Sequence, residues 1–388
     1  MNSFEFATAQ QILFGPGKVS QLPAIAARLS IHRCMVVTGR SRERVQPCLD
    51  LLAESGIALT HFAVHSEPSV SDLQHAASVA AEAGCDGVIA IGGGSVLDTG
   101  KAVAALMRNP GDPFDYLEVI GKGRPLEHPS APCIAVPTTA GTGSEVTRNA
   151  VLYSPEHAVK VSLRSPFMLP AAAIVDPELT REIPPAITAS TGMDALTQLI
   201  EPYTSQRANA FTDALCVEAL PLAAQALPRA FRDGSDSEAR EWMSLASLFG
   251  GLALANAGLG VVHGFAGPLG GMFDAPHGAI CAAILPHGMA ANLSHIRRSP
   301  SPESPVLLGR YRTIARLLTG SELAQPEDGV AHIRGLVHDL GISGLSAYGM
   351  SPENLDDVVD KSARASSMKA NPVLLSHEEL AEVYLKSL

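Results

Sequence analysis

Two histidines in a glycine-rich, apolar stretch are the residues of this sequence best suited to chemistry. His263 and His277 lie fourteen residues apart, and each is followed by glycine. Neutral imidazole is the commonest metal ligand among protein side chains. Because Pro268 and Pro276 lie between the two histidines, the sequence excludes one unbroken helix across the interval. The two imidazoles therefore either converge from different elements or belong to unrelated places in the fold.

A second polar pair lies upstream, in the segment TGMDALTQLIEPY at 191–203. Asp194 and Gln198 are four residues apart, so a helix places both side chains on one face. A carboxylate with a further donor one turn away makes half of a metal site. The same spacing also fits an ordinary polar helix face, and this segment alone does not decide between the two interpretations.

A glycine-rich turn follows the apolar run GVIAI at 87–91 and precedes a helical stretch at 96–107. Glycine lets the backbone approach a phosphate closely, and free N–H groups at a helix N-terminus bind the anion. The G-x-G-x-x-G fingerprint fails because residue 97 is Leu, and the Walker A pattern fails as well. A tight strand-to-helix connection without a ligand is the alternative for this turn, which consists of Gly92, Gly93, Gly94 and Ser95.

Hydroxyl side chains gather after another apolar run, in PTTAGTGSEVT at 137–147. Ligands of open α/β sheets bind at the carboxyl ends of the parallel strands. Hydroxyls in this loop can bond the ribose or the nicotinamide amide of a nucleotide, and the candidates are Thr138, Thr139 and Thr142. A capped loop without a ligand is the alternative, but two polar strand-end loops in one sheet favour a dinucleotide.

The elements that position these residues follow from the hydrophobic pattern. Strand candidates at 34–39, 57–63, 87–91, 133–137 and 172–176 alternate with helical stretches near 19–29, 41–55, 71–83 and 96–108. This alternation predicts a Rossmann-like parallel sheet covered on both faces. After Pro184-Pro185, Ala, Leu and Met recur at helical spacing. We therefore predict a dinucleotide-binding α/β domain at 1–181 and an all-α metal and substrate domain at 182–388.

The composition of the chain limits the classes of binding partner that we expect. The net charge is −11, which argues against nucleic acid or an anionic membrane as the main partner, since both require basic surface. The uncharged stretch at 243–262 contains several glycines and lacks basic flanks, so it predicts a buried helix rather than a membrane span. Six widely spaced cysteines indicate free thiols, and the N-terminus lacks the pattern of a signal peptide. We expect a cytoplasmic protein.

Four motifs in this order resemble those of the iron-containing, or group III, alcohol dehydrogenases. They are GGGSVLDTGKA at 92–102, PTTAGTGSEVT at 137–147, MDALTQLIEPY at 193–203 and the stretch with His263 and His277. The resemblance covers nearly the whole chain, including FGPG at 14–17. It implies a dinucleotide-binding α/β domain, a helical domain whose divalent metal (Fe²⁺ or Zn²⁺) holds the substrate oxygen, and a homodimer.

The resemblance also implies roles for single residues. The pyrophosphate cradle would be Gly92, Gly93, Gly94 and Ser95, with Asp98 in the same motif. The ribose and nicotinamide contacts would be Thr138, Thr139 and Thr142, joined by Lys160 at the ribose. Asn149 matches a position near the nicotinamide, and Asp194, His263 and His277 match three of the four metal ligands. The expected catalytic residues are therefore Asn149, His263 and His277.

Three positions depart from the family pattern. Gln198 stands where the fourth ligand is usually His, and a Gln carbonyl is a weaker and harder donor than imidazole. Gly267 stands where a second His usually lies near the nicotinamide, which leaves water or the cofactor ribose hydroxyl as the proton route. Gly39 follows the first strand where members that prefer NAD carry Asp, and Arg40 comes next. An acid there would repel a 2′-phosphate, so NADP is admissible here besides NAD.

The expected reaction is reversible hydride transfer between an alcohol and NAD(P)⁺, which yields an aldehyde or ketone. One alternative is a metal-independent reductase of an acidic or phosphonate aldehyde or keto acid, similar to maleylacetate reductase, and Gln198 favours it. A lyase similar to dehydroquinate synthase is less compatible with the apolar segments GLGVV and CAAIL beside the histidines. A cofactor-binding protein without catalytic activity is the remaining alternative.

Overall fold

The computed structural model describes residues 3–157 and 159–388 and divides into two compact units. The α/β unit comprises Ala7–Thr139 and Gly143–Arg181. The helical unit comprises Glu182–Leu388 together with residues 3–6 and Ala140–Thr142. The division therefore falls at residue 182, apart from two short segments that the sequence prediction had assigned to the α/β domain.

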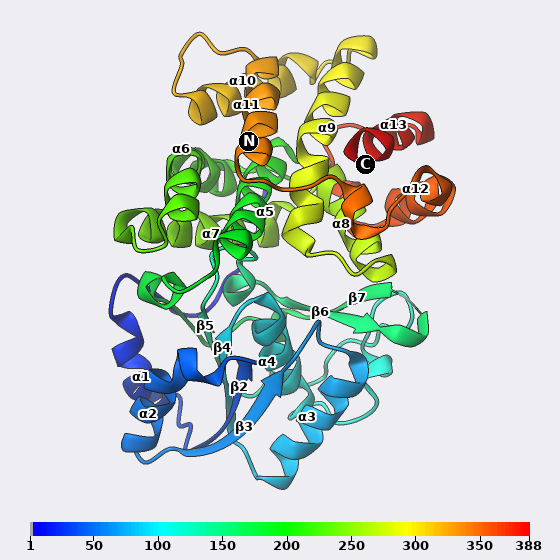
Figure 1. Ribbon diagram of the computed structural model, residues 1–388. Helices are drawn as coiled ribbons and strands as arrows, with labels where there is room; N and C mark the ends of the chain where they lie inside the picture. The colour runs from blue at the N-terminus through cyan, green and yellow to red at the C-terminus, as the bar shows by residue number, and fades with distance from the viewer. Residues whose placement is uncertain (1–2, 158) are drawn as a thin grey trace. The chain divides into compact units, whose positions relative to one another are not determined.

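Six strands form one sheet in the α/β unit (Figure 1): Ile12–Phe14 (β1), Arg33–Gly39 (β2), Ala58–Val64 (β3), Gly87–Gly92 (β4), Cys133–Pro137 (β5) and Ala172–Val175 (β8). Their order is β1-β8-β5-β4-β2-β3, and every pairing is parallel. The chain runs outward from β2 to β3 and then crosses to β4 on the other side of β2. The carboxyl ends of β2 and β4 thus flank a topological switch point, where doubly wound sheets bind nucleotides. The predicted α/β fold class is confirmed.

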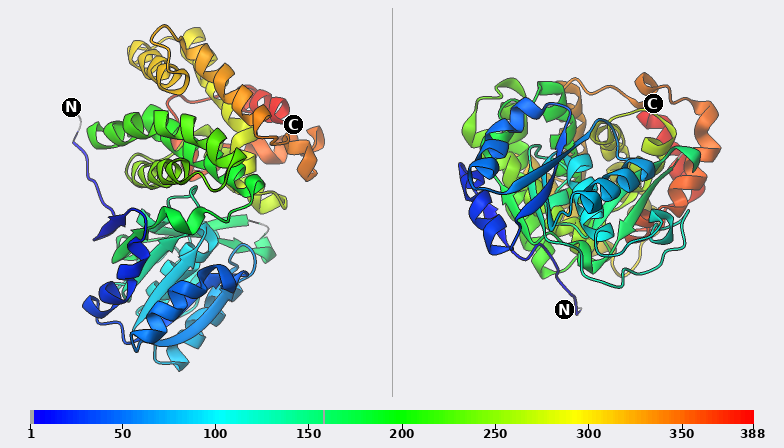
Figure 2. Two further views of the ribbon diagram at one scale, coloured as in Figure 1. Left: turned by 60° about the vertical axis from the view of Figure 1, so that its left-hand side comes forward. Right: turned by 90° about the horizontal axis from the view of Figure 1, so that it is seen from below.

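The sheet separates two hydrophobic cores. Its covering helices are Leu22–Arg28 (α1), Gln46–Glu54 (α2), Val70–Glu82 (α3) and Gly94–Leu106 (α4). Met35 and Val37 of β2 pack with α3 and α4, whereas Cys34 and Val36 of the same strand pack with α1 and α2. Successive strand residues point to opposite faces, so an apolar run without polar alternation fills both cores. Figure 2 shows the helices of this unit on the two sides of its strands.

Two glycines bring α4 close to the end of β4. A Cβ atom at Gly92 would lie 2.6 Å from the Val96 side chain, and one at Gly100 would lie 2.5 Å from the Cβ of Ala90. Both distances are shorter than side-chain packing permits, so glycine is required at each position for this contact between helix and strand. The tight connection predicted at residues 92–95 thus ends in a helix that begins at Gly94, without a side-chain cap.

A two-stranded antiparallel ribbon lies outside the main sheet, and the sequence prediction did not contain it. Its strands are Asn149–Ser154 (β6) and Val159–Arg164 (β7). Ala150 and Leu152 alternate with half-buried residues along β6 and join the core beneath α4. The ribbon therefore extends the α3–α4 side of the unit.

The helical unit contains helices α5 to α13 (Figure 1). They span Pro185–Thr204 (α5), Ala210–Arg232 (α6), Ser237–Ala257 (α7), Val261–Met272 (α8), His277–Arg298 (α9), Ser304–Thr319 (α10), Pro326–Asp339 (α11), Leu355–Arg364 (α12) and His377–Ser387 (α13). One continuous apolar core connects them, and α5 and α9 contribute many of its fully buried residues. The predicted all-α second half is confirmed.

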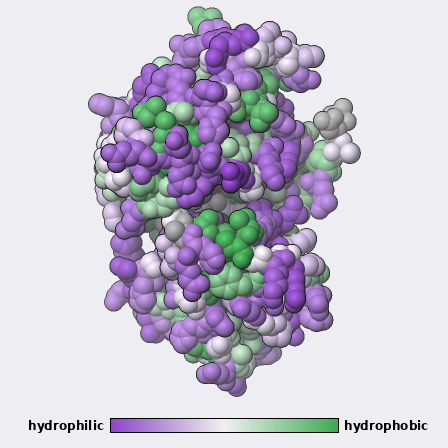
Figure 3. Space-filling model, turned by 90° about the vertical axis from the view of Figure 1, so that its right-hand side faces the viewer, coloured by the Kyte–Doolittle hydropathy of each residue, from purple (hydrophilic) through white to green (hydrophobic). Residues whose placement is uncertain are grey.

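Several of these helices are strongly apolar. Length and composition alone would let α6 and α9 span a membrane, as would α7 and α8 together if their 98° bend were ignored. In the structure, all four helices supply buried residues to the core of the helical unit. The uncharged stretch at 243–262 comprises most of α7, the turn at 258–260 and the start of α8. Hydrophilic side chains cover most of the face shown in Figure 3, with apolar side chains in smaller patches.

Candidate metal and cofactor sites

Helix α5 carries the acidic residues of the candidate metal site. Asp194, Gln198 and Glu201 lie three or four residues apart along it, so they share one face. All three are at least 95% buried, although side chains of these types are rarely buried unless they have partners. A helix buried among apolar neighbours therefore places three polar side chains at one location in the core.

Helix α8 brings His263 to this face of α5. The carboxylate of Glu201 accepts hydrogen bonds from the backbone N–H of Val262 at 2.7 Å and from His263 Nδ1 at 2.7 Å. An anion at a helix N-terminus is favourable because the first N–H groups of a helix lack partners within it. A Cβ atom at Gly260 would lie 2.9 Å from Glu201 Oε1, so glycine is required there for this close approach. Glu201 thus fixes both the start of α8 and the orientation of the His263 ring.

Helix α9 begins at His277 and carries the other two members of the cluster. Cys281 lies one turn after His277, which puts its sulfur on the same face of the helix. A Cβ atom at Gly278 would lie 2.0 Å from the backbone oxygen of Ser190 in α5. Glycine at position 278 thus lets the first turn of α9 rest against the backbone of α5. The two histidines come from different helices, as the prolines between them predicted.

The side chains of Asp194, His263, His277 and Cys281 converge so that one ligand atom of each lies within 4.8 Å of the others. Asp194 Oδ1 is 3.3 Å from His263 Nε2 and 3.8 Å from His277 Nε2. Cys281 Sγ is 3.9 Å from His263 Nε2 and 3.7 Å from His277 Nε2. The structure therefore assembles three of the predicted metal ligands and adds a thiol that the sequence prediction had not selected.

Two buried oxygen atoms on this face of α5, Asp194 Oδ1 and Gln198 Oε1, have no hydrogen-bond partner among the residues that the structure describes. Because His263 Nδ1 donates to Glu201, the neutral ring presents the lone pair of Nε2 to Asp194 Oδ1. Two acceptors 3.3 Å apart in a buried site require a cation or a proton between them. The donor set of carboxylate, two imidazoles and thiol suits a divalent transition metal, so these residues fit the metal that the sequence implied.

The pKa shifts of the residues in the cluster indicate the same need for positive charge. Burial opposes protonation of His263, but Cys281, Asp194 and Glu201 outweigh it and raise the pKa of His263 well above its ordinary value. Burial is likewise outweighed at His277, where Cys281 and Asp194 raise the pKa. For Asp194, burial favours the neutral acid, but His277 and His263 prevail and lower its pKa. Protons thus supply the positive charge that a metal ion supplies when it binds.

Sequence reasoning missed Glu201 and Cys281. Glu201 stands in the quoted segment MDALTQLIEPY, seven residues after Asp194 and therefore on the same helix face. Cys281 lies four residues after His277, where the same helical spacing would have revealed it. Cys281 is one of the free buried cysteines that the sequence predicted, and its place beside the two histidines was not predicted.

In the α/β unit, the two predicted cofactor loops lie side by side at the carboxyl edge of the sheet. Gly92 at the end of β4 pairs with Pro137 at the end of β5, and the N–H of Thr138 donates to the Gly92 carbonyl oxygen at 2.9 Å. A Cβ atom at Gly93 would lie 3.4 Å from Thr139 Oγ1. The glycine turn and the first two threonines therefore form one polar surface beside the first turn of α4. Thr142 groups with the helical unit.

Asp98 and Asn149, also predicted at the cofactor, belong to a buried cluster around Lys101. Lys101 Nζ donates to the Ser144 carbonyl oxygen at 2.9 Å, to Thr147 Oγ1 at 2.8 Å and to the Asn149 carbonyl oxygen, and it lies 3.0 Å from Asp98 Oδ1. Asp98 Oδ2 also accepts from the backbone N–H of Val151 at 2.8 Å. These bonds hold the threonine loop and β6 against α4. Through these contacts, Asp98 also helps to hold the threonine loop in place.

The remaining predicted positions lie at the edges of this surface. Gly39 is the last residue of β2, beside the switch point between β2 and β4. Lys160 lies on β7, where its Nζ is 3.2 Å from Glu67 Oε1. In the helical unit, an added Cβ at Gly267 would meet no atom within 4 Å, so α8 leaves open space one turn after His263.

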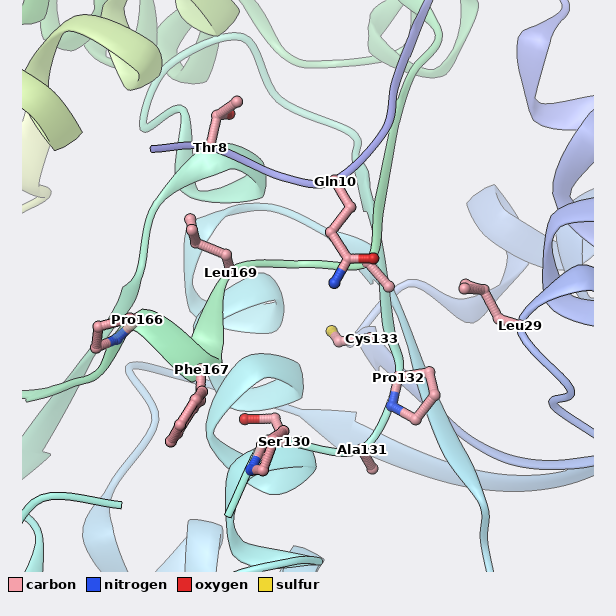
Figure 4. Close-up of a pocket in the computed structure, with 12 residues that line it drawn as sticks. Thr8, Gln10, Leu29, Ser130, Ala131, Pro132, Cys133, Pro166, Phe167 and Leu169 are labelled. Carbon is pink, nitrogen blue, oxygen red and sulfur yellow. The ribbon is translucent and has the colours of Figure 1, made fainter. Parts of the chain in front are cut away.

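A hollow of ≈ 310 Å³ lies in the α/β unit, and Figure 4 shows residues that line it. Cys133, Pro132 and Ala171 line it, together with the backbone segment that includes Thr8 and Gln10. These residues stand at or before the starts of β5 and β8, whereas doubly wound sheets bind ligands at the carboxyl ends. The hollow is therefore at the opposite edge of the sheet from the two predicted cofactor loops.

Comparison with known proteins places the chain in a family. Residues 9–177 match the family "Iron-containing alcohol dehydrogenase", and residues 188–388 match "Fe-containing alcohol dehydrogenase family, C-terminal". The chain is 34% identical to a 1,3-propanediol dehydrogenase of Klebsiella pneumoniae, with 98% of each chain covered. It is 32% identical to a lactaldehyde reductase of Escherichia coli, with 96% of each covered.

Solved structures agree with this assignment. A sulfoacetaldehyde reductase from Bifidobacterium kashiwanohense in complex with NAD⁺ has a TM-score of 0.88 and 30% identity, with 100% of this chain and 99% of that chain covered. The chain belongs to the iron-containing alcohol dehydrogenase family, which makes it an oxidoreductase of alcohols or aldehydes. Membership also implies NAD(H) and a divalent metal as cofactors.

Proposed function

We propose that the protein catalyses reversible hydride transfer between a small alcohol and a nicotinamide dinucleotide, with the substrate oxygen held in the helical unit by a divalent metal. The observation that supports this most directly is the convergence of Asp194, His263 and His277 around a buried carboxylate oxygen without a hydrogen-bond partner. When bound there, a divalent metal supplies a Lewis acid that polarises the substrate oxygen and lowers the pKa of an alcohol.

The residues of the chain then have distinct tasks. Asp194 offsets part of the positive charge of the site, and His263 and His277 must present neutral imidazole nitrogens. Glu201 fixes the His263 tautomer through the bond from Nδ1, so that Nε2 faces Asp194 and the ligand cluster. The open space beside Gly267 leaves room for a substrate or a water molecule but supplies no imidazole to move a proton. Without an imidazole there, water or a ribose hydroxyl of the bound cofactor would be the route for the alcohol proton.

The cofactor lies, in this proposal, at the carboxyl edge of the parallel sheet. The first turn of α4, from Gly94, offers N–H groups to the pyrophosphate, and the glycines before it let the phosphates approach the backbone. Thr138 and Thr139 stand beside that turn and can bond the ribose or the nicotinamide amide. Asn149, Lys160 and Thr142 retain the roles that the family resemblance implies.

We propose that NADP is accepted as well as NAD. Gly39 ends β2 at the position where an acidic side chain would bind the ribose 2′-hydroxyl and repel a 2′-phosphate. Arg40 and Arg42 follow it in the sequence, and both are exposed. We also propose a cytoplasmic homodimer, since all six cysteines are free, which suits a reducing compartment, and the family resemblance favours a dimer.

A metal-independent reductase of acidic aldehydes is the second candidate, because Gln198 stands where the family resemblance expects a ligand histidine. The sulfoacetaldehyde reductase among the similar structures is named for an acidic aldehyde. Under this candidate, the cluster around Asp194 would serve protonation of the substrate oxygen without a metal, and activity would survive metal removal.

Absorbance at 340 nm tests the proposal. Protein purified without chelator is assayed with short diols, simple alcohols and their aldehydes, and with sulfonated and phosphonated aldehydes, using each of NAD(H) and NADP(H). We expect turnover of neutral alcohols and aldehydes that disappears after metal removal and returns with added Zn²⁺ or Fe²⁺. Turnover of acidic aldehydes alone, unaffected by removal of metal, would establish the second candidate instead.

A further inference from the structure

We propose that the Cys281 sulfur is the fourth metal ligand of this protein and that Gln198 is not a ligand. The inference rests on the proposed function, since it concerns the same site. It departs from the ligand set that the sequence predicted, which was Asp194, Gln198, His263 and His277. It also changes the chemical class of metal that the site favours.

The spacing of the ligand atoms fits one tetrahedral ion. With metal–nitrogen and metal–oxygen distances of about 2.0 Å and a metal–sulfur distance of about 2.3 Å, the edges of a tetrahedron are about 3.3 Å between N and O and about 3.5 Å between N and S. The corresponding distances to Asp194 Oδ1 are 3.3 and 3.8 Å, and those to Cys281 Sγ are 3.9 and 3.7 Å. The ligand atoms would have to move together by only a few tenths of an ångström to reach the distances of a tetrahedral site.

The position of Cys281 in the fold agrees with this role. Its side chain is fully buried, and its sulfur lies near two imidazole nitrogens at 3.7 and 3.9 Å, which is long for a hydrogen bond. The i, i+4 spacing from His277 is the spacing by which one helix face presents two ligands to a single ion. Helix α9 therefore supplies two ligands, whereas α5 and α8 supply one each.

Gln198 is a poorer fourth ligand than Cys281. Its amide oxygen Oε1 is buried without a hydrogen-bond partner among the described residues, one helical turn after Asp194. A neutral amide oxygen is a weak, hard donor, while a thiolate is a strong, soft and charged one. Of the two, the sulfur is therefore the ligand that a divalent transition metal prefers.

A thiolate ligand changes which metal is retained. Soft sulfur ligands select Zn²⁺ over the magnesium and manganese that prefer oxygen donors, and in the general affinity order Zn²⁺ also binds more tightly than Fe²⁺. Carboxylate, two imidazoles and one thiolate bring two negative charges to a dication, so the loaded ligand set is neutral. Zinc, rather than iron, is therefore the metal that this chain would hold most tightly.

Cobalt substitution tests the assignment without using activity. Metal-free full-length protein is titrated with Co²⁺, and the near-ultraviolet absorption is recorded, because a thiolate bound to Co²⁺ gives an intense charge-transfer band there. We expect this band at one equivalent of Co²⁺ in the unmodified protein and in Gln198→Ala. We expect its loss in Cys281→Ala, together with a fall in Zn²⁺ affinity of about 100-fold or more. Cys216→Ala is the matched control, since Cys216 is a buried cysteine of α6 in the same unit.

The outcomes separate this inference from the proposed function. If the unmodified protein binds one Co²⁺ without the band, and Gln198→Ala rather than Cys281→Ala loses the metal, Gln198 is the ligand and the inference is wrong while the metal site stands. If the unmodified protein binds no metal and still reduces aldehydes, the proposed metal-dependent function is wrong as well. Because the cobalt spectrum of the unmodified protein is decisive by itself, a variant that fails to fold does not remove the test.

Discussion

Two polar clusters, one in each unit, both contain an aspartate carboxylate but differ in how completely their atoms are paired. In the α/β unit, Lys101 Nζ is surrounded by four oxygen atoms, and Asp98 bonds both to that cluster and to the β6 backbone. In the helical unit, the buried Asp194 Oδ1 has no hydrogen-bond partner within the described part of the chain.

This difference in hydrogen-bond pairing distinguishes a structural cluster from a binding site. A buried polar group without a partner costs free energy that folding must offset, so an unpaired group that persists in a core marks a place where something else binds. The Lys101 cluster satisfies its own atoms and stabilises the loop that carries the threonines. The Asp194 cluster brings a carboxylate, two imidazoles and a thiol into mutual reach and leaves their lone pairs for a cation.

The largest expected effect comes from removing one ligand of the unpaired cluster. His277→Ala should lose both bound metal and activity, since the remaining groups no longer surround the ion. Metal content by elemental analysis and turnover at 340 nm are measured on the same sample. His287→Ala, on the same helix and outside the cluster, is the control. Full activity of His277→Ala without metal would contradict the metal-dependent account.

Replacing Lys101, the centre of the paired cluster, should lower the free energy of unfolding and leave the metal site intact. Lys101→Met leaves the buried Asp98 carboxylate without its cation, which typically costs about 3–5 kcal/mol of unfolding free energy. Urea denaturation of the full chain measures this change, and metal content of the folded variant should stay at one equivalent. Lys122→Met removes an exposed lysine paired with Asp115 and should cost under about 1 kcal/mol. A Lys101→Met protein as stable as its parent would refute the scaffold role.

A buried carboxyl beside the paired cluster should make stability depend on pH. Burial raises the pKa of Glu145 to about 7, against the partly opposing effects of a backbone hydrogen bond and Lys101. Between its unfolded pKa of 4.5 and about 7, the folded protein holds a proton that the unfolded chain has released. Stability should therefore fall as pH rises through this window and level off above it, by about 3 kcal/mol in total.

Glu145→Gln isolates that contribution. The variant should show a flatter dependence of unfolding free energy on pH between 4.5 and 7, and a relative gain at pH 8. The exposed residue Glu54 provides a matched control as Glu54→Gln, which should retain the pH dependence of the parent. Identical pH profiles for Glu145→Gln and the parent would show that the Glu145 carboxyl ionises normally in the fold.

The smallest expected effect comes from the residue that orients a ligand without being one. Glu201 accepts from the backbone of Val262 and from His263 Nδ1. Glu201→Gln replaces one acceptor oxygen by an N–H₂ group facing a donor, so the His263 ring loses its fixed orientation. Zinc affinity should fall about 10- to 100-fold, and activity should recover at high zinc concentration. Glu218→Gln, on the exposed face of α6, is the control, and equal zinc affinity in both variants would exclude this role for Glu201.

Much of the fold could be predicted from the sequence because the patterns that indicate strands and helices lie within short segments. The apolar runs at β2, β4 and β5 and the Pro184-Pro185 boundary before α5 report the elements directly. The short edge strand β1 and the ribbon of β6 and β7 escaped prediction. Strand β1 has three residues, too few for a recognisable hydrophobic pattern. Strand β6 alternates buried and half-buried residues, but polar loop residues flank it on both sides.

The candidate site was only partly predictable, for a physical reason. His263, His277 and Asp194 could be proposed from residue type and from the family resemblance. That Cys281 and Glu201 join them depends on how α5, α8 and α9 pack, and in particular on the contact of Gly278 with Ser190 and of Gly260 with Glu201. Asp98 shows a second limit of sequence motifs. It lies in a predicted cofactor motif, and the structure shows its carboxylate in contact with Lys101 and with the backbone of β6.

Stoichiometric reconstitution is the most direct test of the central claim that activity depends on metal held by Asp194, His263 and His277. Metal-free protein is titrated with Zn²⁺, and bound metal and alcohol oxidation are measured at every point. The account predicts activity that rises in proportion to bound metal and reaches its limit at one ion per chain. Full activity in protein shown to contain no metal would contradict it.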